Sequence, residues 1–277
     1  MEINEYVHLI KKDFNVTEDV KRHVNIYLIT GKNCYLVDSG VSGSEILISE
    51  YMKSIGRKLT DIKAVFLTHA HPDHIGAAAE LKKQTGCQVY APFQGIDWIE
   101  DVQKQFTERP IPNFFKLVSE SVKVDSPLLD GEVIELEKGI TMKSLATPGH
   151  SDDSMSYILN NRILFTGDAI PAPNDLPIFV HYEECIKSID KIQQMVGIVK
   201  YCPAWDKVYN REELCNISMK SKNLLHKLKL VVLEVDNELA NLTEEERKQE
   251  ICKRLNMQNF FGNPLFMKSI DSCREEK

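Results

Sequence analysis

The chain has 277 residues and a formal net charge of −7, with 43% hydrophobic and 27% charged residues. This composition is typical of a soluble globular protein, and the negative charge argues against a general nucleic-acid-binding surface. The apolar runs are far shorter than the roughly 18 residues of a membrane span, so we expect no membrane contact. The N-terminus is acidic and polar, so we expect no signal peptide and a cytoplasmic location. The seven cysteines form no C-x-x-C pair, which favours reduced thiols.

The first part of the chain predicts strands followed by a helix. Residues 6–14 and 25–37 are rich in apolar and β-branched side chains, and residues 30–33 read Thr-Gly-Lys-Asn, which is typical of a hairpin turn. Residues 44–55 place apolar side chains at helical spacing. We therefore expect a pair or more of strands and one helix before the first histidine motif.

A histidine motif follows the next predicted strand. Residues 64–67 form a short apolar run that is opened by Asp61-Ile62-Lys63 and indicates a buried strand. Residues 69–74 then read His-Ala-His-Pro-Asp-His. Pro72 argues against helix through the motif, so we expect helix to restart only at about Ile75. The motif is thus predicted to lie on a loop at the carboxyl end of a strand, where α/β proteins place ligand sites.

The spacing within the motif predicts a metal site. Side chains two residues apart in an extended segment share a face, so His69 and His71 can bind one ion together. Asp73 and His74 follow the turn and can point at a second position beside the first. Imidazole and carboxylate ligands suit zinc, and also iron or manganese.

The middle of the chain alternates strands with less regular segments. Residues 87–91 predict a further parallel strand, whereas residues 93–126 carry several aromatic side chains between prolines. These aromatic residues form either an apolar wall beside the metal site or ordinary core under a loop. Strands are then predicted at 129–136, 140–145, 155–159 and 162–165, the last two joined by Asn160-Asn161 in a hairpin.

The last part of the chain is mainly helical. Residues 182–196 predict an amphipathic helix, residues 198–203 a final strand, and the chain from residue 211 a long helix with one apolar stripe. Residues 243–246 (Thr-Glu-Glu-Glu) offer a capping box for another helix. We expect a first domain over residues 1–208 and a helical extension over 209–277 that packs on it and either covers the site or forms a homodimer face.

Three motifs in register resemble the metallo-β-lactamase superfamily. They are the histidine motif at 69–74, Thr-Pro-Gly-His-Ser at 147–151 and Thr-Gly-Asp at 166–168. The resemblance implies an α/β fold, a four-layer αββα sandwich, with a helical C-terminal extension. It also implies two divalent ions, zinc in the first place with iron or manganese as alternatives. By this resemblance His69, His71 and His150 would hold the first ion, Asp73 and His74 the second, and Asp168 would bridge them. A seventh candidate ligand, Asp206, does not come from the resemblance.

Asp206 enters this set because the chain departs from the family at its end. Where two-metal members carry a further histidine after the final strand, this chain has Trp205, whose indole N–H donates and cannot ligate. Either Asp206 supplies an oxygen ligand, which would favour iron or manganese, or the second metal position is weak or empty. The alternative for Asp206 is a turn residue beside a packing tryptophan.

Asp38 has two interpretations in this setting. The family places an aspartate here beside the metal loop, and a carboxylate that orients imidazoles from behind is physically sensible. The alternative is an aspartate that only forms the turn after the strand ending at residue 37. The sequence leaves both open.

The resemblance implies hydrolysis of a small-molecule acyl compound. A hydroxide held between two ions would attack an ester, thioester or lactone carbonyl, with Asp73 or Asp168 moving the proton. His74, where one class of β-lactamases has arginine, argues against an antibiotic-degrading role. The alternatives are a persulfide dioxygenase-like oxidoreductase with one iron and a non-catalytic metal-binding regulatory protein.

Overall fold

The computed structural model describes residues 1–18 and 20–274, and these form two compact units. Unit 1 consists of Met1–Ala146, Asp153–Gly167 and Gly197–Val208, and unit 2 of Thr147–Asp152, Asp168–Val196 and Tyr209–Lys277. The predicted domain boundary after residue 208 coincides with one of these divisions. Residues 147–152 and 168–196, which the sequence places in the first domain, group with the C-terminal helices instead, and the domain limits stay a prediction.

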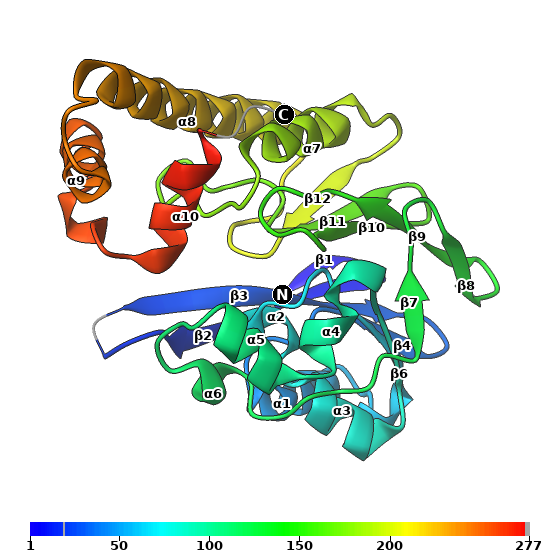
Figure 1. Ribbon diagram of the computed structural model, residues 1–277. Helices are drawn as coiled ribbons and strands as arrows, with labels where there is room; N and C mark the ends of the chain where they lie inside the picture. Colours follow the sequence, from blue (N-terminus) through cyan, green and yellow to red (C-terminus); the bar gives the residue numbers. More distant parts are fainter. Residues whose placement is uncertain (19, 275–277) are drawn as a thin grey trace. The chain divides into compact units, whose positions relative to one another are not determined.

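The first sheet of unit 1 carries the histidine motif (Figure 1). Its strands follow chain order: β1 (Glu2–Asn4), β2 (Val7–Asn15), β3 (Lys21–Thr30), β4 (Cys34–Val37), β5 (Ile62–Phe66), β6 (Gln88–Pro92) and β7 (Ser126–Leu128). Strands β1 to β4 pair antiparallel, whereas β4, β5, β6 and β7 pair parallel. β5 therefore lies inside the sheet, which explains its nearly continuous apolar sequence.

The second sheet of unit 1 has the order β12-β11-β10-β9-β8. Its strands are β8 (Val133–Glu137), β9 (Ile140–Ala146), β10 (Met155–Leu159), β11 (Ile163–Gly167) and β12 (Lys200–Pro203). Asn160 and Asn161 join β10 to β11 with φ values of 50° and 54°, the left-handed pair that a tight type I′ hairpin requires. The hairpin predicted from the two asparagines is confirmed.

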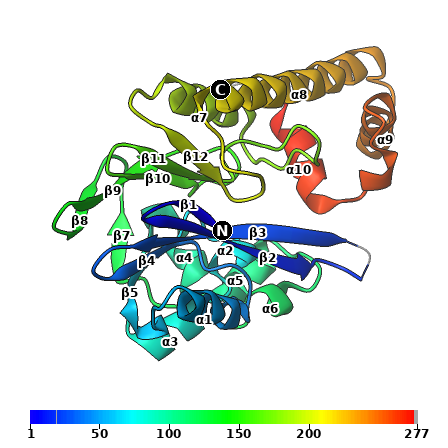
Figure 2. The ribbon, with the colours of Figure 1, turned by 180° about the vertical axis from the view of Figure 1, so that it is seen from behind.

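Short helices cover one face of the first sheet, and the second sheet packs on the other (Figures 1 and 2). The helices are α1 (Ser44–Ser54), α2 (Pro72–Ile75), α3 (Ala78–Thr85), α4 (Ile96–Ile99), α5 (Val102–Glu108) and α6 (Phe114–Leu117), with 3-10 turns η1 (Leu59–Asp61) and η2 (Phe93–Gly95). One apolar core joins α1 and α3 to the first sheet, and another, around Phe66, Tyr157 and Phe165, lies between the sheets.

Two sequence interpretations are resolved in this layer of helices. Helix does not wait until about Ile75, because α2 begins at Pro72 itself; proline is tolerated at the first helical position, where its missing N–H has no partner to lose. Among the aromatic residues of 93–126, Phe114 is buried and Trp98 and Phe106 pack on the same core. The core interpretation is therefore confirmed for these three side chains.

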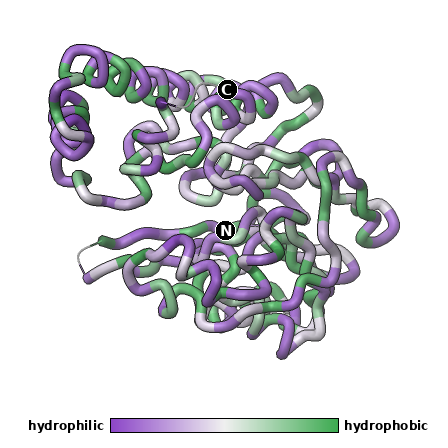
Figure 3. The backbone as a smooth tube through the Cα atoms, viewed as in Figure 1, coloured by the Kyte–Doolittle hydropathy of each residue, from purple (hydrophilic) through white to green (hydrophobic). Residues whose placement is uncertain are grey.

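Unit 2 is helical and has its own core. Its helices are α7 (Tyr182–Gln194), α8 (Arg211–Glu238), α9 (Glu244–Arg254) and α10 (Pro264–Ser272), with the 3-10 turn η3 (Gln258–Phe260). Figure 3 shows hydrophilic and hydrophobic residues alternating along α8, and Leu228, Val232 and Val235 bury its apolar stripe against α7, α9 and α10. The predicted capping box is present, since Thr243 and Glu246 cap α9 reciprocally. No helix within residues 1–18 and 20–274 is long and apolar enough to cross a membrane.

Candidate metal centre

Three buried imidazoles converge on the loop that follows β5 in unit 1. The exposed fractions of His69, His71 and His74 are 1%, 4% and 0%. His69 Nε2 lies 2.9 Å from His71 Nδ1, and the ring centroids of His69 and His74 are 4.0 Å apart. The carboxylate of Asp73 borders this cluster, with Oδ2 3.7 Å from His74 Nε2. The loop after β5 and the first turn of α2 thus bring His69, His71, Asp73 and His74 together.

Asp38 fixes one of these imidazoles from behind. Its Oδ2 accepts a hydrogen bond from His74 Nδ1 at 2.8 Å, and its Oδ1 accepts the backbone N–H of Thr68 at 2.8 Å. Because Nδ1 of His74 then carries the proton, Nε2 keeps the lone pair that a metal ligand needs. Asp38 also has a φ of 60°, so it forms the turn and orients the imidazole at once. The orienting interpretation is confirmed.

The backbone of the histidine loop is held by side chains that the sequence did not single out. Asp153 Oδ2 accepts the Ala70 N–H at 2.7 Å, and Gln105 Nε2 donates to the Ala70 carbonyl at 2.6 Å. The Tyr157 hydroxyl donates to the carbonyl of Leu67 at 2.7 Å. Asp153 follows the 147–151 motif by two residues, which is the one signal that could have indicated its role.

Unit 2 contains the second pair of predicted ligands. His150 Nε2 lies 3.4 Å from Asp168 Oδ2, while His150 Nδ1 donates to the carbonyl of Ile178 at 2.9 Å. The proton on Nδ1 again leaves Nε2 as the nitrogen with a lone pair. Both side chains are close to fully buried, with exposed fractions of 10% and 8%. Unit 2 therefore presents an imidazole and a carboxylate to the same point.

The turn that carries His150 is fixed against α7. Gly149 has a φ of 132°, and a Cβ atom there would lie 2.4 Å from Cys185 Cα, so only glycine allows this approach. Its carbonyl accepts the N–H groups of Val180 and His181, and Ser188 Oγ donates to the carbonyl of Pro148 at 2.7 Å. The close contact between this turn and α7 thus explains the glycine of the Thr-Pro-Gly-His-Ser motif.

Trp205 and Asp206 lie on the loop after β12 in unit 1. The Trp205 ring packs edge-on against Phe14 at 6.4 Å, and the Arg22 guanidinium lies 5.8 Å from its centre. Asn25 Nδ2 donates to the Asp206 carbonyl at 2.7 Å, and the exposed Asp206 carboxylate accepts the Lys207 N–H at 2.7 Å. Trp205 is therefore a packing residue, and a ligand role for Asp206 stays a prediction.

The donors present fit a divalent transition ion. In unit 1, His69 offers a ligand nitrogen within 4.8 Å of one on His71 and of one on His74. Buried imidazoles, one of them backed by a carboxylate, are a zinc- or iron-binding arrangement. In unit 2, His150 and Asp168 add a nitrogen and an oxygen. The sequence motifs predict that these two sets of ligands bind the same ions.

The comparisons with known proteins identify the class. Residues 20–197 match the family described as the metallo-beta-lactamase superfamily, and the chain therefore belongs to that superfamily. A metallo-beta-lactamase family protein from Thermus thermophilus superposes with a TM-score of 0.71 at 18% identity, covering 97% of this chain and 93% of that one. The α/β sandwich predicted from the sequence is confirmed.

Curated relatives match part of the chain. A hydroxyacylglutathione hydrolase from Rhodopseudomonas palustris is 34% identical over 116 residues, which make up 42% of this chain and 35% of that protein. An atrochrysone carboxyl ACP thioesterase from Claviceps purpurea is 32% identical over 149 residues, 53% of this chain and 39% of that protein. The alignments therefore span well under half of either relative's length.

Proposed function

We propose that the protein is a metal-dependent hydrolase of small acyl thioesters. The observation that carries the proposal is the buried cluster of His69, His71 and His74, with Asp38 behind it, on the loop after β5. Membership of the superfamily and two relatives named for the hydrolysis of acyl-thiol compounds support the thioester class.

The ligand roles follow the predicted set. His69, His71 and His150 would hold one ion, Asp73 and His74 a second, and Asp168 would contact both. When bound, the ions supply Lewis acidity at neutral pH. Asp38 keeps the His74 proton on Nδ1, and Asp73 or Asp168 would accept the proton of the attacking water.

The chemistry of the leaving group favours a thioester over an ester. A thiol has a pKa of about 8.5, so a thiolate departs at neutral pH without a strong proton donor. An alkoxide leaving from an ester or lactone needs a proton at the moment of bond cleavage. The roles proposed for Asp73 and Asp168 are those of proton acceptors, and no proton donor is assigned, which matches the easier leaving group.

A matched substrate panel tests the proposal. The purified chain is assayed with a thioester, an oxygen ester of the same acyl group and a lactone, after loading with zinc, iron or manganese. We expect the thioester to be hydrolysed fastest, and His69→Ala to abolish turnover while the circular dichroism spectrum is unchanged. Equal or faster turnover of the oxygen ester would overturn the thioester assignment, and no turnover of any substrate with any metal would overturn the hydrolase itself and favour a regulatory metal-binding role.

Trp205 supports one alternative, an iron-dependent oxidoreductase of the persulfide dioxygenase type. Its indole N–H cannot ligate, and it packs on Phe14, so the second ion lacks the family's last histidine. A single iron per chain together with oxygen uptake in the presence of a persulfide would identify this activity. Two metals per chain and thioester turnover would exclude it.

A further inference from the structure

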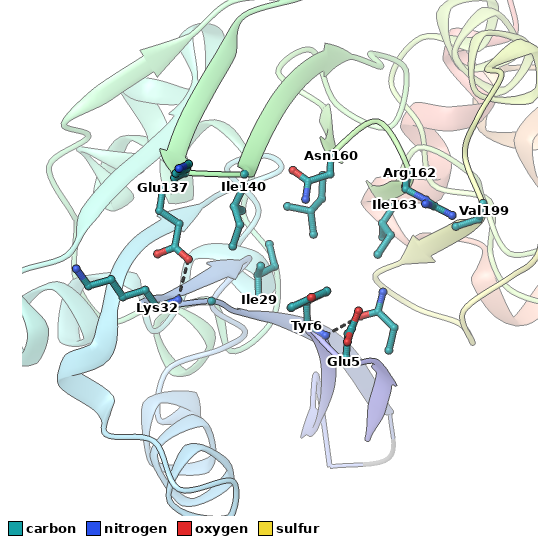
Figure 4. A pocket seen from close by; sticks show the side chains of 15 residues that line it. Glu5, Tyr6, Ile29, Lys32, Glu137, Ile140, Asn160, Arg162, Ile163 and Val199 are labelled. Atoms are coloured by element: carbon teal, nitrogen blue, oxygen red, sulfur yellow. Dashed lines mark hydrogen bonds between the residues drawn. The ribbon is translucent and has the colours of Figure 1, made fainter.

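A cavity of about 720 Å³ opens between the two sheets of unit 1, and no role has been assigned to it so far (Figure 4). It is lined by the β3–β4 turn at Lys32, the β8–β9 turn at Gly139 and the β10–β11 turn at Asn160. The β3–β4 turn precedes β4, which runs parallel to β5, whereas the histidine loop follows β5. The cavity therefore lies at the end of the first sheet where β4 and β5 begin, whereas the imidazole cluster lies at the end where β5 finishes.

The inner wall of this cavity is apolar and comes from both sheets. Ile29 of β3 is fully buried, and Leu159 and Ile163 of the second sheet have exposed fractions of 4% and 5%. Ile140 and the half-exposed Val199 complete the wall. Its size lies within the range of about 300–1,000 Å³ in which proteins bind small molecules.

The rim of the cavity carries three exposed cations: Lys32, Lys138 and Arg162. Among residues 1–18 and 20–274, none of the three side chains forms an ion pair. In a chain with a net charge of −7, three cations outside any ion pair around one apolar hollow indicate an anionic ligand.

The two carboxylates at the rim form no ion pair with these cations. Glu137 Oε1 accepts the Lys32 backbone N–H at 2.7 Å, and its Oε2 accepts the Asn33 N–H at 3.1 Å and the Tyr35 hydroxyl at 3.2 Å, so Glu137 serves the β3–β4 turn. Glu5 lies beside the Tyr6 hydroxyl and raises its pKa by its charge. Both carboxylates are thus engaged by hydrogen-bond donors of the protein other than the three cations.

Asn160 adds a neutral donor next to Arg162. Its Oδ1 accepts the Thr141 N–H at 2.8 Å and the Thr141 hydroxyl at 3.3 Å, so its amide N–H groups are the ones available to a ligand. Figure 4 shows Asn160 and Arg162 on the same side of the cavity, above Ile163. A planar guanidinium beside an amide donor matches the two oxygens of a carboxylate.

We propose that this cavity binds an aliphatic carboxylate, with the chain of the ligand against Ile29, Ile140 and Ile163 and its carboxylate at Arg162 and Asn160. The inference is independent of the function proposed for the histidine cluster. A ligand of this class covers the apolar wall, removing it from water, and supplies an ion-pair partner for Arg162 in the same molecule.

Calorimetric titration of decanoate into the full chain tests the proposal. We expect saturable binding that Arg162→Glu weakens by about tenfold or more, because a charge-assisted hydrogen bond of about 1.5–3 kcal/mol is lost. Lys116→Glu, an exposed lysine on α6, is the matched control and should bind decanoate like the unchanged protein. Decanol should bind more weakly than decanoate, since it lacks the charge.

A second variant tests the apolar wall. Val199→Trp fills the cavity from its half-exposed side and should abolish binding, while thermal unfolding checks that the variant folds. Any of three results would overturn the assignment. They are no saturable binding of decanoate to the unchanged chain, undiminished binding to both Arg162→Glu and Val199→Trp, and equal affinity for decanol and decanoate.

Discussion

Oδ2 of Asp38 lies 2.8 Å from Nδ1 of His74, and the side chains of the two residues are 3% and 0% exposed. The pair joins the end of β4 to the loop after the neighbouring strand β5. Because a buried carboxylate holds the proton on Nδ1, the tautomer of His74 is set before any ligand binds. The loop geometry is thus fixed by a residue that lies outside the histidine motif.

Replacing Asp38 by asparagine tests this relationship. Asparagine tolerates the positive φ of this turn, so Asp38→Asn removes the charge with little backbone strain. We expect zinc affinity, measured by competition with a chelator, to fall by about ten- to hundredfold. Asp97→Asn, at an aspartate whose side chain is 77% exposed, should leave the affinity unchanged; an unaltered affinity in Asp38→Asn would show that the carboxylate has no orienting role.

Asp153 is expected to stabilise the histidine loop through Ala70. In the unchanged chain the Ala70 N–H donates to Asp153 Oδ2 at 2.7 Å. Asp153→Ala removes this acceptor. The free energy of unfolding should fall by about 1–3 kcal/mol, and zinc affinity should fall as well. Urea denaturation measures the first effect, with Asp13→Ala as the control, since the Asp13 side chain is 81% exposed. A loss no greater than that of Asp13→Ala would contradict this role.

Gly149 offers a test of the contact between turn and helix in unit 2. Gly149→Ala places a methyl group 2.4 Å from Cys185 Cα in addition to the strain of a positive φ. Gly43→Ala also places alanine at a positive φ, here 84°, with no atom within 4 Å of the added methyl, and should cost only about 1–2 kcal/mol. We expect Gly149→Ala to be clearly more destabilising in thermal unfolding, and equal melting temperatures would rule out the close contact.

Cysteine reactivity should separate one thiol from the rest. Cys215 is exposed, whereas the other six cysteines are buried, and burial raises the pKa of Cys34 to about 11 and that of Cys185 to about 12. Because only the thiolate reacts, an alkylating reagent at pH 8 should modify Cys215 alone in the native protein and all seven after denaturation. Mass spectrometry that finds Cys185 labelled in the native state would contradict the packing of α7.

Local sequence patterns predicted most of the strands and helices. The apolar run before His69 became β5, the paired asparagines became the β10–β11 turn, and the Thr243 capping box starts α9. The start of α2 at Pro72 was missed because proline was treated as a break rather than as a first helical residue.

Contacts between distant segments were harder to predict. Asp153 and Gln105 reach Ala70 across 83 and 35 residues, and no spacing rule links such positions. The cavity at Arg162 is also built from turns that carry no motif. The candidate ligands of each unit were predicted from their motifs, and their binding of metal stays a prediction. The roles of Trp205 and Asp206 depend on how the loop after β12 folds.

The metal content of the purified chain tests the central claim most directly. Elemental analysis is made after purification without added metal and again after loading, on the unchanged chain, on a His69→Ala, His71→Ala variant, and on His23→Ala as a control outside the motif. We predict at least one transition ion per chain in the unchanged protein and in the control, and its loss from the double variant with the fold intact. A correctly folded chain that retains no such ion under any loading condition would contradict the account.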